Sequence, residues 1–197
     1  MNRDLRFEVA ERVRADGSIE TALDVAAVRA AVRKMAEAEV KSIAVCCLYG
    51  FLTPDHEQQI LDIIAEEHPE SFRSASHAVA PEFREYERMS TTVVNAYLGP
   101  VMERYIQRLK QRLAELGVAV APQLTQSNGG VIGFDAAASL PVRTVLSGPS
   151  TGVVAAQAIG RMAGFNNVIT FDVGGTSSDV ALLRNGDKLV AEASFES

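Results

Sequence analysis

The sequence predicts an α/β protein, because stretches with a helical spacing of apolar residues alternate with short apolar runs typical of strands. A helix-spaced stripe from Val25 to Met35 precedes the continuous apolar run Ser42 to Tyr49. A second helical pattern, Thr53 to Ile64, precedes a weaker strand candidate, Ser71 to Ala80. This alternation favours helices packed in layers on strands. The 197 residues allow one large domain or two small ones.

Composition and charge exclude several kinds of partner. The formal net charge is −6, so an electrostatic grip on nucleic acid is not expected. The start, Met1 to Gly17, is charged throughout and lacks the apolar core of a signal peptide. The longest apolar run, Ile43 to Leu52, is too short to span a bilayer. We therefore predict a cytoplasmic protein with neither nucleic-acid nor membrane partners.

The only cysteines are the neighbours Cys46 and Cys47. Successive side chains of a strand point to opposite faces, so these two are not expected to form a disulfide. They are interpreted as small buried apolar residues. Together with three scattered histidines they give no zinc-binding pattern.

The first elements begin with a turn and a helix cap. Asp16-Gly17 follows the weakly alternating stretch Arg6 to Arg14 and predicts an outer hairpin. Asp24 is a good cap for the next helix, because its side chain can accept hydrogen bonds from the first free amides. The apolar stripe of that helix comprises Val25, Val28, Val32 and Met35. The apolar run Ser42 to Tyr49 then reads as a strand covered on both faces.

Proline and threonine mark the next helix. Thr53 is expected to cap it, Pro54 suits its first position, and Pro69 ends it. A longer helical stretch follows from Pro81 to Leu116. We expect it to break near Gly99-Pro100, since proline removes a helix donor and clashes with the preceding turn.

The second half continues with short elements. The pattern predicts a strand over Val118–Thr125, a turn at Gln126–Gly130, a short helix over Phe134–Ser139, a strand near Arg143–Leu146, a helix from Ser147 to about Ala163, a strand from Val168, a hairpin turn at Arg184–Asp187 and a strand over Lys188–Ala193. The chain begins in a hairpin and stops soon after a strand, so both ends are read as cuts through a longer protein.

The stretch VITFDVGGTSSDVALL, residues 168–183, carries the clearest chemistry. Gly174 and Gly175 lack a Cβ, so their amides could approach a ligand closely and form a concave anion site. Asp172 repels a phosphate unless Mg²⁺ lies between the two. Asp179 is a candidate second carboxylate near that ion. Thr176, Ser177 and Ser178 add hydroxyl donors.

A plain hairpin is the alternative, with Gly-Gly supplying positive φ and the polar residues solvated. The binding-site reading is favoured because the run Val168 to Phe171 is expected to be buried, and a charge at such a strand end is costly unless paired or metal-bound. A second anion site is expected where Ser147 to Gly152, including Gly148 and Gly152, opens a helix. Its alternative is a simple strand-to-helix turn. The lysine-containing phosphate loop and the dinucleotide glycine pattern are absent.

These motifs resemble a known family. FDVGGTSSDV, residues 171–180, is similar to the second phosphate loop of the actin-like ATPase superfamily. Further segments resemble the hydantoinase A/5-oxoprolinase family in order and spacing along nearly the whole chain. They are TPDHE at 53–57, Ser76-His77, EYERMSTTVVNAYLGP at 85–100, QSNGG at 126–130 and SGPSTG at 147–152.

The resemblance implies an incomplete actin-like ATPase (ribonuclease H-like) architecture, with mixed sheets flanked by helices. Residues 1–117 would be the C-terminal portion of the family's N-terminal region, and 118–197 the start of its ATP-binding domain. The complete protein would hydrolyse a cyclic amide, a hydantoin or 5-oxoproline, by phosphorylating the amide oxygen. ATP and Mg²⁺ are the implied cofactors.

In this reading Asp172 and Asp179 hold the metal, and the glycine loop holds phosphate through Gly174, Gly175, Thr176 and Ser177. No catalytic residue is assigned. Two alternatives stay open: a subunit of an ATP-dependent acetone or acetophenone carboxylase, and a non-catalytic nucleotide-binding or assembly module. The family further implies a hydantoinase B-type partner subunit and an oligomer for the complete protein.

The sequence departs from the family pattern at several points. Ser178 stands where the family usually has Thr, and Ala78 stands where Glu is usual. Nothing before Arg14 matches the family's first glycine loop, and the expected adenosine site is missing. The chain by itself is therefore expected to be inactive and to bind nucleotide only weakly.

Other polar residues have structural alternatives. His56 is expected to make a structural hydrogen bond at a helix start, and His68 to lie at the surface. Of the three histidines, His77 is the best candidate for binding substrate or for a contact between lobes. The alternative is a structural histidine whose hydrogen bonds are satisfied within the protein. Residues 85–88 are read as a charged helix face, with a binding or interlobe role for Tyr86, Arg88 and Thr91 as the family-based alternative.

Overall fold

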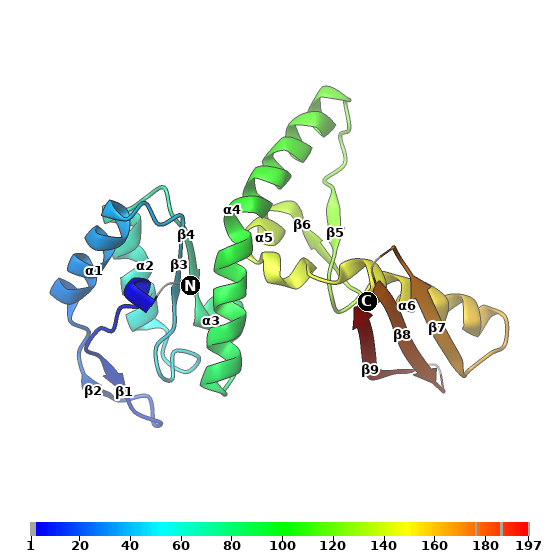
Figure 1. Cartoon of the computed structure of the whole chain (residues 1–197), viewed down its shortest axis with the longest axis horizontal. Helices are drawn as coiled ribbons and strands as arrows, with labels where there is room; N and C mark the ends of the chain where they lie inside the picture. Colours follow the sequence, from blue (N-terminus) through cyan, green and yellow to red (C-terminus); the bar gives the residue numbers. More distant parts are fainter. Residues whose placement is uncertain (1–2, 176, 186, 197) are drawn as a thin grey trace. The chain divides into compact units, whose positions relative to one another are not determined.

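The computed structural model describes residues 3–175, 177–185 and 187–196, and the side chains of Ser177 and of residues 187–196 are not described. The chain divides into two compact units. The first comprises Met1–Val118 and Ala138–Val142, and the second comprises Ala119–Ala137 and Arg143–Ser197. Figure 1 labels the elements of each unit. The family domain boundary after Gly117 stays a prediction.

Helices and strands alternate, which confirms the α/β class. The helices are α1 (Val25–Glu37), α2 (Asp55–Glu67), α3 (Ser76–Val79), α4 (Glu85–Glu115), α5 (Phe134–Ser139) and α6 (Ser147–Met162), with 3₁₀ turns at Arg3–Leu5 and Pro141–Thr144. The strands are β1 (Arg12–Val13), β2 (Ile19–Thr21), β3 (Ser42–Val45), β4 (Phe72–Ala75), β5 (Gln123–Thr125), β6 (Val131–Gly133), β7 (Val168–Val173), β8 (Ser177–Arg184) and β9 (Asp187–Glu196).

The sheets are small, and each is either wholly parallel or wholly antiparallel. Strands β3 and β4 are parallel, while β1–β2, β5–β6 and β7–β8–β9 are antiparallel. Within the described residues no sheet mixes the two orientations, unlike the mixed sheets expected. The two hairpins predicted from turn signals, β1–β2 and β8–β9, are both confirmed.

The core of the first unit lies around the β3–β4 pair. Helices α1 and α2 lie together on one side of the strands, and α4 lies on the other side (Figure 1). Side chains from α1, α2 and both strands form one buried cluster. Its members are Leu23, Val28, Val32, Ile43, Val45, Cys47, Ile60, Ile63, Ile64 and Ala75. The apolar side chains that the sequence places at helical spacing therefore face this core, as expected for an amphipathic helix.

The two helix starts in this unit differ. Asp24 caps α1 as predicted, because its Oδ1 accepts a hydrogen bond from the Ala27 amide at 3.0 Å. The prediction for α2 was wrong by one position, since Pro54 is the cap residue and no side chain caps the helix. Thr53 instead closes the preceding turn, where its amide donates to the Tyr49 carbonyl at 3.1 Å.

Both parallel strands are shorter than the apolar runs predicted. Strand β3 ends at Val45, because the chain turns around Cys47 and Tyr49 adopts a left-handed φ of 58°. Strand β4 ends at Ala75, where α3 begins. Both cysteines are free, as expected, but Cys46 is exposed and only Cys47 is buried. Burial raises the pKa of the Cys47 thiol.

The predicted break at Gly99-Pro100 was wrong, since α4 is one helix that includes Pro100. Gly99 and Ala96 are buried, and the Cα of Gly99 lies against the Phe72 ring of β4. An interior proline costs about 3 kcal/mol or more in a helix. We attribute the continuity of α4 to packing on β3 and β4, which local sequence preference does not include.

Arginines of α1 pair with the end of α2 and make stability dependent on pH. Arg29 and Arg33 donate to the Glu67 carboxylate at 2.8 to 2.9 Å. Hydrogen bonds from Arg33 and then Arg29 lower the pKa of Glu67 from 4.5 to about 2. A depressed carboxyl pKa stabilises the folded state above the unfolded value, and this stabilisation is lost as pH falls through the folded value.

We therefore expect the midpoint of urea unfolding of the first unit to fall as pH is lowered from 4.5 toward 2. In Glu67→Gln the stability of the first unit should depend less on pH over this range, as measured by hydrogen exchange of α1 and α2 peptides. Glu70→Gln, at an exposed position nearby, is the control. An unchanged profile in Glu67→Gln would contradict the assignment.

The second unit packs α6 on one face of the β7–β8–β9 sheet. Its core consists of Val153, Ala181 and Leu183, with Ala156 and Val168 beside them. The short helix predicted over Phe134–Ser139 is confirmed. The strand predicted near Arg143–Leu146 was wrong, because Pro141–Thr144 is a 3₁₀ turn and Leu146 has a left-handed φ of 61°.

The predicted burial of Val168 to Phe171 was wrong for half of its residues. Ile169 and Phe171 are each 70% exposed, whereas Val168 and Thr170 are partly buried. Alternate side chains of a strand point to opposite faces, and α6 covers only the face that carries Val168 and Thr170. None of the described helices is long and apolar enough to cross a membrane.

Candidate functional site

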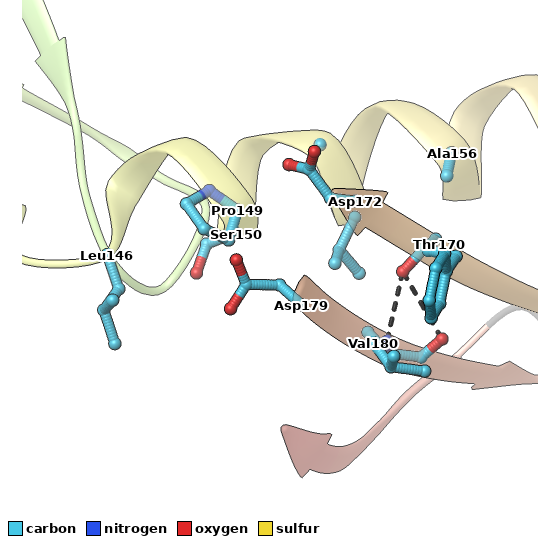
Figure 2. Close-up of a pocket in the computed structure, with 12 residues that line it drawn as sticks. Leu146, Pro149, Ser150, Ala156, Thr170, Asp172, Asp179 and Val180 are labelled. Carbon is cyan, nitrogen blue, oxygen red and sulfur yellow. Dashed lines mark hydrogen bonds between the residues drawn. The ribbon is translucent and has the colours of Figure 1, made fainter. Parts of the chain in front are cut away.

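A pocket of about 210 Å³ lies between the first turns of α6 and strands β7 and β8. Figure 2 shows its lining, with α6 on one side and the two strands on the other. The lining residues are Leu146, Pro149, Ser150, Gly152, Val153, Ala156, Thr170, Phe171, Asp172, Asp179, Val180 and Ala181.

The two predicted metal ligands lie together in this pocket. Asp172 of β7 and Asp179 of β8 are directly opposite each other in the antiparallel register. Side chains in such a pair are about 5 Å apart at Cβ, and like charges there destabilise the sheet. Asp172 is exposed and Asp179 is partly buried. Among the side chains that the structure describes, no arginine or lysine forms an ion pair with either carboxylate.

The start of α6 supplies the opposite wall. Leu146 takes the cap position, and the Ser150 amide donates back to the Leu146 carbonyl at 3.3 Å. The preceding amides of a helix have no partner within the helix and carry its positive end. Gly152 lines the pocket, and a Cβ at Gly148 or Gly152 would meet no atom within 4 Å. This wall is thus open and favours an anion.

The glycine loop joins β7 to β8 in a hairpin, as the alternative reading expected. The φ of Gly175 lies outside the left-handed region, and a Cβ there would meet no atom within 4 Å. The need for positive φ therefore does not explain Gly175. Gly174 and Gly175 are not among the pocket-lining residues. Thr176 lies outside the described residues, and of Ser177 only the backbone is described, as the start of β8.

The structure thus brings together Asp172, Asp179 and Gly152 of the predicted residues, and leaves Gly148, Gly174 and Gly175 outside the lining. Sequence reasoning missed Thr170, whereas Ser150 lies within the predicted anion site Ser147 to Gly152. Thr170 precedes Asp172 by two residues, and this spacing places both on one face of the strand. Its hydroxyl accepts from the Ala181 amide at 3.2 Å and so ties the two strands beside the carboxylates.

The Gln126–Gly130 turn supports α6 from another side. Gly129 has a left-handed φ of 84°, and a Cβ there would lie 2.5 Å from a methyl group of Val154. The Asn128 side chain accepts from the Gly130 amide at 2.8 Å. These contacts fit the turn predicted at Gln126–Gly130, and none of its residues lines the pocket.

A separate polar cluster in the first unit surrounds Glu57. This fully buried carboxylate accepts hydrogen bonds from the Cys47 amide, the Ser76 hydroxyl and both the amide and the ring of His77, at 2.6 to 2.8 Å. His77 is therefore held by its Nδ1, in agreement with the structural reading. A Cβ at Gly50 would lie 2.5 Å from Glu57, so only glycine fits there.

Arg88 completes this cluster, and its burial corrects the reading of residues 85–88 as a charged face. Its guanidinium donates to the Ser76 hydroxyl at 3.1 Å and to the Cys47 carbonyl at 2.8 Å. Tyr86 is exposed, and the Thr91 hydroxyl donates to the Glu87 carbonyl of its own helix.

The remaining histidines have structural partners. His56 pairs through Nδ1 with Glu11 at 2.8 Å, as the structural reading of this residue expected. His68 is half-buried, and its Nε2 lies 2.7 Å from the Val40 carbonyl. Within the described residues, no three histidine, cysteine or acidic side chains gather as a metal site would require. Two carboxylates suffice for Mg²⁺ when phosphates and water supply the other ligands.

Several known proteins resemble this chain in sequence, among them a caprolactamase subunit and a 5-oxoprolinase. The alpha subunit of caprolactamase from Pseudomonas jessenii is 39% identical over 93% of this chain and 26% of its own length. The 5-oxoprolinase of Saccharomyces cerevisiae is 34% identical over 83% of this chain and 12% of its own length. The matched part of the chain thus spans about a quarter of the length of the caprolactamase subunit and a smaller share of the length of the 5-oxoprolinase.

Two solved structures resemble it in fold. The nucleotide-free structure of acetone carboxylase, from work on ATP-dependent acetone carboxylation, has a TM-score of 0.85 at 27% identity and covers 96% of this chain and 29% of that chain. The crystal structure of the ATP-dependent caprolactamase from Pseudomonas jessenii has a TM-score of 0.81 at 32% identity. The match covers 98% of this chain and 30% of the caprolactamase chain.

Two family models also match. The model described as Hydantoinase/oxoprolinase N-terminal region covers residues 1–68. The model described as Hydantoinase/oxoprolinase covers residues 88–195, which is more than half of the chain and includes the whole lining of the pocket. The protein therefore belongs to the hydantoinase/oxoprolinase family.

Proposed function

We propose that the pocket between α6 and β7–β8 binds the phosphate end of ATP through Mg²⁺. The observation that carries this proposal is the pairing of Asp172 with Asp179 in adjacent strands, with no described basic side chain between them. Two opposed carboxylates are costly in a sheet, and a divalent cation would remove that cost. Both residues fit Mg²⁺, which prefers carboxylate oxygens and retains water and phosphate ligands.

The size of the pocket supports a partial site. Pockets that enclose a whole small ligand usually measure about 300–1,000 Å³. The pocket of about 210 Å³ would accommodate phosphates and a metal ion, but a whole nucleotide would need further walls. Gly152 and the start of α6 would face the phosphates, and the amides of Gly174, Gly175 and the following Thr176 and Ser177 would complete the cradle. Gly148 is proposed to contribute through its backbone.

For the complete protein we propose ATP-dependent hydrolysis of a cyclic amide, as in a hydantoin, 5-oxoproline or a related lactam. The caprolactamase and 5-oxoprolinase relatives support this substrate class. An amide carbonyl is a poor electrophile, and transfer of the γ-phosphoryl group of ATP to its oxygen, with release of ADP, activates the carbon toward water. Attack by water and cleavage of the C–N bond then open the ring, and a second water hydrolyses the resulting acyl phosphate to the carboxylate and free phosphate. The proposed fold is the actin-like ATPase architecture, of which this chain would form a part.

A carboxylase subunit is the second candidate, because the acetone carboxylase chain shares the fold with a TM-score of 0.85. The pocket does not separate the two reactions, since both use ATP. Several relatives are named as subunits, including caprolactamase alpha and acetophenone carboxylase gamma. We therefore propose that the complete protein works with a hydantoinase B-type partner subunit, as an oligomer in the cytoplasm.

Binding of Mg²⁺ and ATP to the chain tests the site. In NMR titrations we expect weak binding of Mg-ATP that shifts the amide signals of Thr170, Asp172 and Asp179. Asp172→Asn should remove these shifts, while the exposed Asp4→Asn should leave them unchanged. Without Mg²⁺, Asp179→Asn should slow hydrogen exchange of β7 and β8, because it removes the repulsion of about a few tenths of a kcal/mol to 1 kcal/mol.

Faster exchange in Asp179→Asn, or equal Mg-ATP shifts in Asp172→Asn and wild type, would refute the metal site. In the complete protein, ATP hydrolysis stimulated by 5-oxoproline, hydantoin or caprolactam would support the amide hydrolase. Stimulation only by acetone with bicarbonate would support the carboxylase instead.

A further inference from the structure

Helix α4 carries a row of exposed apolar side chains along one face. Tyr97 is 78% exposed, Tyr86 is 74% exposed and Val101 is 61% exposed, although all three are large and apolar. We call this row the α4 stripe. Its members are Tyr86, Met89, Val94, Tyr97, Val101 and Tyr105.

The α4 stripe lies on the face opposite the buried one. Successive helix residues are turned by about 100°, so residues 86, 97 and 101 fall on one side of the helix. The buried residues fall on the other side, which packs on β3 and β4. They are Arg88, Thr92, Asn95, Ala96, Gly99 and Ile106. The contacts of the first unit therefore use only the buried face of α4 and leave the α4 stripe exposed.

The stripe has the composition of an interface. It extends over about 28 Å at 1.5 Å per residue. It holds Tyr86, Tyr97 and Tyr105, which are three of the four tyrosines in the chain. Exposed apolar patches of this extent mark interaction surfaces, and tyrosine is enriched among the residues that contribute most binding energy.

Charges at the two ends indicate which partner fits. Glu87 is exposed beside the first turn of the stripe, and its only described ion pair is with Arg84 on the same helix at 3.7 Å. Arg104 and Arg108 are exposed at the other end. Two copies of α4 in parallel would place like charges together. Two copies in antiparallel would place Glu87 of one beside Arg104 and Arg108 of the other.

We propose that the α4 stripe pairs with the α4 stripe of a second copy of this chain, antiparallel about a two-fold axis at Tyr97. A two-fold interface uses the same surface on both subunits. With its axis at Tyr97, Val93 faces Val101, Met89 faces Tyr105 and Tyr86 faces Arg108. This pairing buries the apolar centre and matches opposite charges at both ends. It does not depend on nucleotide binding.

Sedimentation equilibrium of the 197-residue chain tests the pairing. We expect a concentration-dependent dimer, whose dissociation constant rises at least tenfold in Tyr97→Asp. Ile19→Asp, which changes an exposed apolar residue of β2, is the matched control and should leave the dimer intact. Arg104→Glu with Arg108→Glu should weaken the dimer, and adding Glu87→Arg should restore it. Circular dichroism checks that each variant keeps its helices.

Cysteine cross-linking gives an independent measure of the axis. In a Cys46→Ser background, Tyr97→Cys should form a disulfide-linked dimer on oxidation, because this position meets itself at the axis. Tyr105→Cys alone should not, since its partner position is Met89. A monomer at all concentrations would overturn the proposal. So would a dimer that Tyr97→Asp leaves intact but Phe171→Asp, on the exposed β7 face, dissociates.

Discussion

Glu57→Ala is expected to lower the free energy of unfolding of the first unit by about 3–5 kcal/mol, because it leaves several buried donors without an acceptor at about 1–3 kcal/mol each. The change removes the acceptor of four hydrogen bonds from two segments of the chain, at Cys47 and at Ser76 with His77. It also leaves the charge of Arg88 buried, because the Ser76 hydroxyl links Arg88 to Glu57. Hydrogen exchange resolved on β3, β4 and α4 peptides measures the effect.

Peptides of the second unit serve as an internal control, since Glu57 has no described contact there. Glu37→Ala, at an exposed position, should change stability by less than about 0.5 kcal/mol. Combining Glu57→Gln with Arg88→Met should be less destabilising than the sum of the single changes, because it removes both charges. A loss below about 1 kcal/mol in Glu57→Ala would show that the cluster is not essential to the fold.

Gly99→Ala is expected to destabilise the first unit by about 1–3 kcal/mol, the range for overpacking. In an exposed helix the same change stabilises by about 1 kcal/mol, because alanine has the higher helix propensity. Here the new Cβ would lie 2.2 to 2.4 Å from ring atoms of Phe72, so α4 would have to move away from β4. The sign of the effect thus separates packing from propensity.

Gly152→Ala in α6 is the matched control for stability, because its Cβ would meet no atom within 4 Å. Urea unfolding, monitored by hydrogen exchange, should show that Gly152→Ala is as stable as the wild type or more stable. Gly99→Ala combined with Phe72→Leu should recover part of the loss, since a smaller side chain makes room. If Gly99→Ala alone raised stability, the close packing of α4 on β4 would be refuted.

Local signals predicted most elements of the fold. Asp24 marked the start of α1, and Asp16-Gly17 and Asn185 with its neighbours marked two hairpins. These signals depend on side chains within a few residues of the backbone that they affect. They failed where a distant contact decides. Thr53 lies in the preceding turn and does not cap α2. Helix α4 does not break at Pro100, which we attribute to its packing on β3 and β4.

The candidate site was predicted in part. The spacing of Asp172 and Asp179 around two glycines indicated a metal and phosphate site, and the hairpin places both in one pocket. Their direct opposition depends on the β7–β8 register, which the sequence does not state. Thr170 was missed for the same reason, since its place in the lining follows from how α6 crosses the strands.

The sequence by itself determined the α/β class and the pair of carboxylates around the glycine loop, because these depend on residue types at short spacing. Its resemblance to the hydantoinase A/5-oxoprolinase family, through motifs along nearly the whole chain, indicated the family. Only the tertiary structure decided which polar residues are buried and which apolar ones are exposed. Glu57 and Arg88 are buried in one cluster, whereas Phe171 and Tyr97 are exposed. Burial depends on segments far apart along the chain, so no local pattern of apolar and polar residues determines it.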